Sequence, residues 1–138
     1  MISVLVNGAG YETGQWCLLK LEEGSHETDT PIRLHPFLQD GRSIDPQVRL
    51  RCHGVHTGNA GQRNDIRTAL AASQASWVIL ALTGHDTSRT DVRTTNAKAL
   101  ALLLQEPDFL HVKVIIISHI GASASKTSWW ERHRLRHT

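Results

Sequence analysis

The N-terminal stretch MISVLVNGAGYETG, residues 1–14, contains a run of apolar residues followed by closely spaced glycines. The run ISVLV, residues 2–6, is mainly β-branched and aliphatic and ends at Asn-Gly, which predicts a strand buried on both faces in a parallel sheet. The next segment, QWCLLKLEEG at 15–24, has the apolar spacing of a helix, with Gly24 at its expected end. The opening therefore predicts a strand, a glycine turn and a helix.

Three glycines, Gly8, Gly10 and Gly14, form the pattern G-x-G-x-x-x-G, which is one residue longer than the standard dinucleotide fingerprint. In such a turn the first glycine makes the tight bend, the second lets the backbone approach a pyrophosphate, and the third lets the helix pack close to the sheet. The N-terminus of the helix adds unpaired N–H groups and a positive dipole end. Two interpretations stay open, a phosphate cradle and a plain turn between strand and helix.

Strand and helix patterns alternate along the rest of the chain. The stretch 53–61 has no regular pattern and is expected to be irregular. The alternation predicts one α/β domain over 1–138, with a mainly parallel sheet of about five strands and helices on both faces. A ligand crevice is expected at the carboxyl ends of the strands, where the strand order reverses. Further strands are predicted at 31–38, 47–52, 76–82 and 111–118, and further helices at 64–73, with Asn64 as its cap, and at 90–105.

The composition is that of an ordinary globular domain. Of 138 residues, 40% are hydrophobic and 20% are charged, and the formal net charge is only +2. The basic residues are scattered except for a short cluster at 131–137, so nucleic acid is not an expected partner. The apolar runs are too short to span a bilayer, so no membrane partner is expected. Cys17 and Cys52, with no leader at the N-terminus, favour free thiols and a cytoplasmic protein.

Four segments carry a resemblance to a known family: VLVNGAGYETG at 4–14, SWVILALTGHDTS at 76–88, DVRTTNAKALALLLQ at 91–105 and VKVIIISHIGASAS at 112–125. In this order they resemble the Rossmann half of short-chain dehydrogenases/reductases, particularly the atypical NAD(P)-binding branch that includes NmrA-like proteins. The resemblance implies a Rossmann-like, doubly wound parallel sheet in three αβα layers. It also implies a nicotinamide dinucleotide, NAD or NADP, as cofactor.

The resemblance implies a set of site residues as well. Residues at the first turn, after the fourth strand and in the next helix are expected to lie along the cofactor, and the turn after the fifth strand is expected to face the substrate. The cofactor residues are Gly8, Gly10, Tyr11, Gly14, Thr83, Gly84 and Asn96, and the catalytic candidates are Ser118 and His119.

The sequence departs from the family where the chemistry is done. Active members use a Tyr as acid/base and a Lys four residues later, at a spacing that brings both side chains to one site. Trp130 and Arg134 stand at the corresponding positions, and the only tyrosine is Tyr11. The match also stops before the family's substrate-binding region. The function is therefore interpreted as an oxidoreductase acting on a carbonyl or alcohol, or as a non-catalytic dinucleotide sensor or interaction module.

The remaining expectations concern the cofactor type, metals and partners. Arg33 in the second predicted strand favours NADP, because an Arg near that strand's end accepts a 2′-phosphate. Cys52, His53 and His56 lie close in sequence but lack a second ligand pair, so they are interpreted as loop residues and no metal is expected. The partners expected are the dinucleotide and a small-molecule substrate, and a homo-oligomer would cover the last strand.

Overall fold

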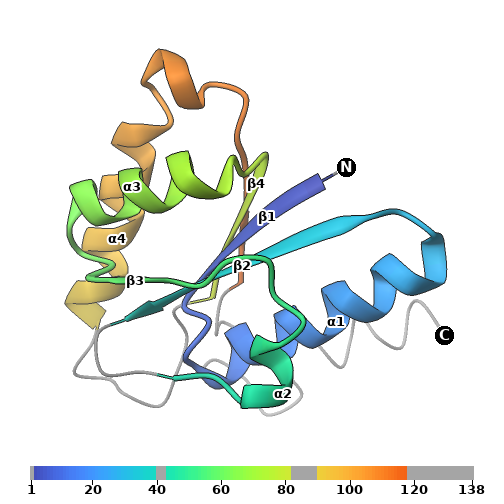
Figure 1. Ribbon diagram of the computed structural model, residues 1–138. Helices are drawn as coiled ribbons and strands as arrows, with labels where there is room; N and C mark the ends of the chain where they lie inside the picture. The colour runs from blue at the N-terminus through green and yellow to red at the C-terminus, as the bar shows by residue number, and fades with distance from the viewer. Residues whose placement is uncertain (1, 40–42, 82–89, 118–138) are drawn as a thin grey trace, which may run out of the picture.

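A computed structural model of the chain describes residues 2–39, 43–81 and 90–117. Its five strands form one sheet in the order β3-β2-β1-β4-β5, and every neighbouring pair is parallel. Figure 1 shows this sheet crossing the centre of the molecule. The predicted α/β class and the sheet of about five parallel strands are confirmed. The strands are β1 (Ile2–Asn7), β2 (Ile32–Gln39), β3 (His56–Gly58), β4 (Trp77–Leu80) and β5 (Lys113–Ile116).

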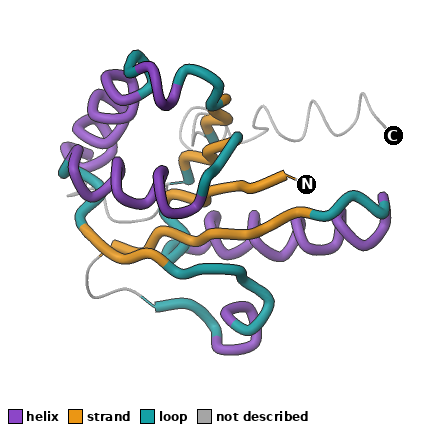
Figure 2. The backbone as a smooth tube through the Cα atoms, turned by 45° about the horizontal axis from the view of Figure 1, so that its top comes forward, coloured by secondary structure: helices purple, strands orange, loops and turns teal. Residues whose placement is uncertain are grey.

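Helices cover both faces of the sheet. Figures 1 and 2 show α3 and α4 together on one side and α1 on the other, which gives three layers. Each parallel crossover passes through one of these helices or through an irregular segment with a short helix. The helices are α1 (Glu12–Thr28), α2 (Pro46–Arg49), α3 (Arg63–Ser73) and α4 (Thr90–Leu103), with a short 3₁₀-helix, η2, at Pro107–Phe109.

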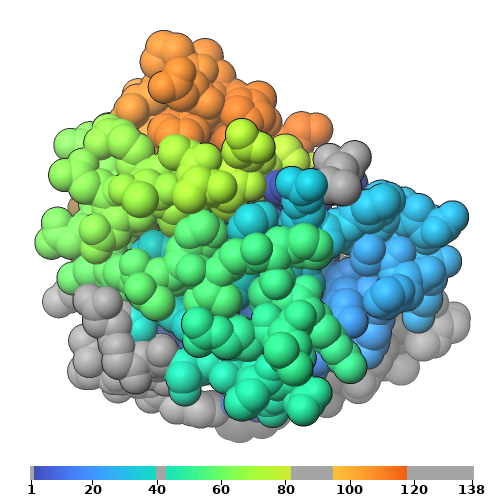
Figure 3. Space-filling model, viewed as in Figure 1, coloured from blue at the N-terminus to red at the C-terminus, as the bar shows by residue number. Residues whose placement is uncertain are grey.

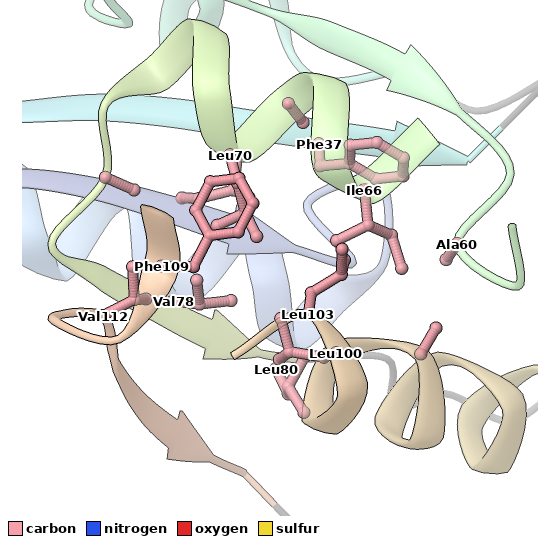
Figure 4. Packing of buried hydrophobic residues seen from close by; sticks show 14 of the residues in the cluster. Phe37, Ala60, Ile66, Leu70, Val78, Leu80, Leu100, Leu103, Phe109 and Val112 are labelled. Atoms are coloured by element: carbon pink, nitrogen blue, oxygen red, sulfur yellow. The ribbon is translucent and has the colours of Figure 1, made fainter. Parts of the chain in front are cut away.

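The alternation of side chains along the strands produces two apolar clusters. Along β1, Leu5 belongs to the cluster beneath α3 and α4, whereas Val4 and Val6 belong to the cluster beneath α1 and α2. Figure 4 shows the first of these, the α3–α4 core, in which Phe37 of β2 lies beside Ile66 of α3. Burial on both faces at the centre of the sheet explains why β1, β2 and β4 have apolar runs instead of alternating polar residues, whereas Ile115 and Ile116 of the edge strand β5 are exposed.

The third predicted strand is wrong. Residues 46–49 form α2, because Asp45 caps a helix whose first residue is Pro46: the Asp45 carboxylate accepts a 2.7 Å hydrogen bond from the Gln47 N–H. The strand itself is β3, which lies within the stretch expected to be irregular. Cys52 consequently lies outside any strand, and its thiol donates to the Val48 carbonyl. Figure 3 shows the segment from α2 to β3, in teal and green, between α1 and α3.

Two helix ends also differ from prediction. Helix α1 continues through Gly24 and ends at Thr28, and its C-cap residue, Asp29, takes the left-handed conformation with φ of 58°. That residue supplies the conformation that glycine usually supplies at a helix C-terminus. Asn64 is not the cap of α3: it lies inside the helix and accepts a hydrogen bond from Arg67, while Gln62 occupies the cap position.

Within the three described ranges, no helix combines the length and the apolar composition needed to cross a membrane.

Candidate functional site

The strand order reverses between β1 and β4. From β1, the chain builds β2 and β3 on one side and then returns to add β4 and β5 on the other. At the carboxyl end of β1, Asn7 is paired with Phe37 of β2 and with Leu80 of β4. In open α/β sheets this reversal point is where ligands bind. The turn that begins at Gly8 therefore lies at the expected place for a site.

The glycine turn is tied to the neighbouring strand by its backbone. Gly8 has φ of 101°, a conformation that residues with side chains rarely adopt. The Ala9 N–H donates to the Phe37 carbonyl at 3.2 Å, and the Tyr11 N–H donates to the Gly8 carbonyl at 3.0 Å. These bonds hold the turn over the ends of β1 and β2.

Gly14 lies closer to the backbone of Gly8 and Ala9 than a residue with a side chain could. It is buried in the first turn of α1. A Cβ atom at this position would overlap the Gly8 carbonyl oxygen and lie 2.7 Å from Ala9 Cα. The helix therefore packs directly on the backbone of the turn, as expected for the third glycine of such a pattern.

The N-terminus of α1 completes the turn. The first turn of a helix has N–H groups without intrahelical partners and a positive dipole end, which together favour an anion. Tyr11 occupies the cap position, is buried, and makes no side-chain capping bond. The exposed Glu12 places a negative charge in this first turn. The backbone therefore favours a phosphate group, while the Glu12 carboxylate opposes it.

A buried amide at this edge was not predicted from the sequence. The Asn7 side chain is 1% exposed, and neither its oxygen nor its nitrogen has a hydrogen-bond partner among the described residues. An unpaired buried amide costs about 1–3 kcal/mol, so such groups usually serve a ligand or an ordered water. The only sequence signal was a polar residue at the end of an otherwise apolar strand.

Asn96 has a different environment from the one expected. It is also 1% exposed, but its Nδ2 donates to the Ala60 carbonyl at 2.8 Å. The Ala60 N–H in turn donates to Gln39 Oε1 at 2.8 Å. Asn96 thus joins α4 to the segment after β3 and, through it, to the carboxyl end of β2.

Arg33 lies far from the turn. It is the second residue of β2 and pairs with Ser3, near the amino ends of the strands. There it lines a pocket of about 360 Å³ together with Glu22 of α1, Arg51 and His53. The carboxyl end of β2 is Gln39. The position of Arg33 therefore gives no support to the argument for NADP.

Several predicted residues lie outside the described residues: Thr83, Gly84, Ser118, His119, Trp130 and Arg134. Of the predicted cofactor residues, the structure brings together Gly8, Gly10, Tyr11 and Gly14 at the carboxyl edge of the sheet.

Comparisons with known proteins identify the architecture. The chain aligns with dTDP-glucose 4,6-dehydratase from Bacillus anthracis str. Ames, solved in complex with NAD, with a TM-score of 0.66 and 15% identity over 93% of this chain and 41% of that one. The chain has a Rossmann-type fold. No protein-family model matches the sequence, and no curated protein matches it.

Two further solved structures share the Rossmann-type fold. AtPrR2 in apo form has a TM-score of 0.57 and 17% identity, covering 99% of this chain and 45% of that chain. The leucoanthocyanidin reductase–NADPH complex from Vitis vinifera has a TM-score of 0.51 and 14% identity, covering 73% of this chain and 32% of that chain. The chain thus spans less than half the length of each of these proteins.

Three histidines, His35, His53 and His56, lie close together where β2 meets β3 and the segment that precedes β3. His35 Nδ1 lies 3.3 Å from His56 Nε2, and the His53 ring centroid is 6.4 Å from that of His35. Burial, and then the charges of His56, His53 and Arg33, lower the pKa of His35, and burial lowers the pKa of His56. No group of three or more His, Cys, Asp or Glu side chains in the described part of the chain is placed to hold a metal.

This histidine pair predicts that the protein is less stable in mild acid. Because both pKa values are lowered in the folded state, the unfolded chain binds more protons below the ordinary histidine pKa of about 6.5. The stability is therefore full above that pH and decreases as the pH falls toward the lowered pKa values of the folded protein. Urea unfolding in EDTA should give a lower midpoint at about pH 5.5 than at about pH 7.5.

Two variants test the cause of this pH dependence. His56→Gln removes one of the two shifted groups and should flatten the pH dependence, whereas His111→Gln changes an exposed histidine and should leave it unaltered. A midpoint that is equal at both pH values in the wild type would exclude the explanation.

Proposed function

We propose that the chain binds a nicotinamide dinucleotide, with the pyrophosphate on the turn between β1 and α1. The observation that carries the proposal is this turn at the strand-order reversal. Gly8 supplies its bend, Gly14 lets the helix pack against its backbone, and the Asn7 side chain has polar atoms without partners among the described residues. Two structurally similar proteins, the dehydratase and leucoanthocyanidin reductase, were solved with NAD and NADPH. The turn and the orphaned amide fit such a ligand in polarity and position.

The chemistry proposed is that of a short-chain dehydrogenase/reductase acting on a carbonyl or alcohol. The bound cofactor would supply the hydride chemistry, and the chain would supply position and charge. Ser118 and His119 follow β5 in the sequence and are the proposed proton-handling residues. The alternative is a non-catalytic dinucleotide sensor, which is favoured by Trp130, because an indole has no acidic hydroxyl to replace the family's tyrosine.

Calorimetric titration with NADPH, NADP, NADH and NAD tests the binding. We expect saturable binding of at least one of these. The titration would also decide between NAD and NADP. The sequence leaves this choice open, because Asp40, which would suit NAD, and Arg42, which would suit NADP, both follow β2. Glu12→Gln should tighten the binding, because it removes a like charge from the first turn of α1. The absence of binding by the folded wild-type chain would refute the proposal.

The two buried asparagines give a matched pair of variants. Asn7→Leu should weaken dinucleotide binding without lowering the free energy of unfolding, because the amide it removes has no hydrogen-bond partner in the described part of the chain. Asn96→Leu should lower the free energy of unfolding by about 1–3 kcal/mol, because it removes the hydrogen-bond donor to the buried Ala60 carbonyl. Equal loss of stability in both variants, measured by urea unfolding, would show that Asn7 is a structural residue.

Turnover separates the enzyme from the sensor. If the chain is an enzyme that uses NADPH, the absorbance of NADPH should fall when small aldehydes and ketones are added. His119→Gln should slow that fall. Binding with no change in absorbance across the panel would favour the sensor.

A further inference from the structure

The histidine pair of β2 and β3 has a geometry that the dinucleotide site does not use. His35 is buried on the same face of β2 as Phe37, and His56 is the first residue of β3. Their rings are tilted by 33° with centroids 5.4 Å apart, and His35 Nδ1 and His56 Nε2 share a hydrogen bond of 3.3 Å, whose donor depends on the tautomers of the two rings. Two ring nitrogens from neighbouring strands therefore approach each other with no carboxylate in the cluster.

We propose that His35 Nδ1 and His56 Nε2 form a chelating pair for a divalent transition-metal ion such as Zn²⁺. Two Zn–N bonds of about 2.0–2.1 Å at a tetrahedral angle hold their nitrogens about 3.3–3.4 Å apart. The separation in the protein is 3.3 Å, so the pair already has the spacing of one edge of a zinc site. Imidazole is a ligand that zinc, copper and nickel share. Binding would replace the hydrogen bond between the two rings: the donating ring shifts its proton to its other nitrogen, so that both lone pairs face one ion.

Gly54 packs closely against the two nitrogens. A Cβ atom there would lie 3.1 Å from His35 Nδ1, which is tighter than ordinary van der Waals contact, and 3.6 Å from His56 Nε2. Gly54 does not have a positive φ, so its backbone conformation does not itself require glycine. An alanine at this position would press on the His35 ring and so gives a measurable way to disturb the pair.

Neighbouring groups do not complete the coordination. His53 Nδ1 accepts a hydrogen bond from the Leu34 N–H, which fixes that ring to the β2 backbone. The Cys52 thiol donates to the Val48 carbonyl, and burial, followed by the charge of Glu22, raises its pKa to about 11. Water or small ligands would fill the remaining two positions of a tetrahedral site.

Protons and neighbouring charges compete with a metal ion at this pair. A histidine binds metal only when it is unprotonated, so metal binding should weaken as the pH falls. The nearby charge of Arg33 opposes a cation, and this repulsion limits the affinity.

Zn²⁺ titration of the full chain, freed of metal with EDTA, tests the site. Binding should be followed by calorimetry and by the NMR signals of the histidine rings. His56→Gln removes one of two ligands and should weaken binding by about tenfold or more, since even the loss of a group that only orients a ligand costs about 10–100-fold. Gly54→Ala keeps both histidines but presses on the His35 ring, and it should also weaken binding. His111→Gln alters an exposed histidine and serves as the matched control.

The outcomes are distinct. Loss of affinity in His56→Gln and Gly54→Ala, with wild-type affinity in His111→Gln, supports the site. If His56→Gln does not fold, Gly54→Ala and the ring signals of His35 and His56 still decide the result. Zinc binding that none of these variants changes, or no binding to the wild-type chain, overturns the proposal. Dinucleotide binding need not change in any of the variants.

Discussion

Gly14→Ala will lower the free energy of unfolding by about 3 kcal/mol or more, at the upper end of the cost of overpacking. The new methyl group would overlap the Gly8 carbonyl oxygen and lie 2.7 Å from Ala9 Cα. These are backbone atoms of a turn that the hydrogen bond from the Ala9 N–H to the Phe37 carbonyl holds in place, so no flexible side chain can move aside. The first turn of α1 must shift away from the sheet, and urea unfolding measures the cost.

Gly24→Ala is the matched control, because it makes the same change in the same helix. A Cβ atom at Gly24 meets nothing within 4 Å. Alanine should therefore stabilise α1 by about 1 kcal/mol, the difference in helix propensity between the two residues. A Gly14→Ala variant as stable as the wild type would mean that the helix does not pack on the turn as described.

Phe37→Ala will lower the free energy of unfolding by about 3–5 kcal/mol, as is usual for truncating a buried aromatic residue. Phe37 is 1% exposed and has the largest volume among the fully buried side chains of the described residues. It lies in the α3–α4 core, where Figure 4 shows it next to Ile66. The truncation leaves a cavity between β2 and α3 that the surrounding strands cannot close.

The conservative variant Phe37→Leu serves as the control for this effect. It retains most of the apolar volume and should cost much less than the alanine variant. Denaturant unfolding of both variants at neutral pH gives the comparison. An alanine variant that loses less than about 1 kcal/mol would show that Phe37 is not at the centre of the core.

The fold class could be predicted because its signals are local. The apolar run of β1, the glycines and the helix pattern of α1 lie within one short stretch, and the apolar runs of β4 and β5 have the composition of buried parallel strands. β3 could not be found in this way: it has three residues, His-Thr-Gly, with no apolar run. Its pairing with β2 is what makes it a strand, and sequence periodicity does not report pairing.

The site could be predicted only in part, for a similar reason. The turn at Gly8 and the close packing of Gly14 follow from the residue type alone, because other residues do not fit there. The isolation of Asn7 depends on which groups surround it in three dimensions, and so does the approach of His35 to His56, which are far apart in the sequence. Arg33 does not reach the crevice because it is the second residue of β2, at the amino end of the strand.

Mapping by amide NMR during titration with NADPH or NADH tests the central claim most directly. If the dinucleotide lies on the turn between β1 and α1, the largest shifts should occur at residues 7–14 and at the carboxyl ends of β2 and β4. Residues at the amino end of β2, such as Arg33, should shift little, because they lie at the opposite edge of the sheet. Saturable shifts centred on that opposite edge, or no shifts at the glycine turn, would contradict the assignment of this site.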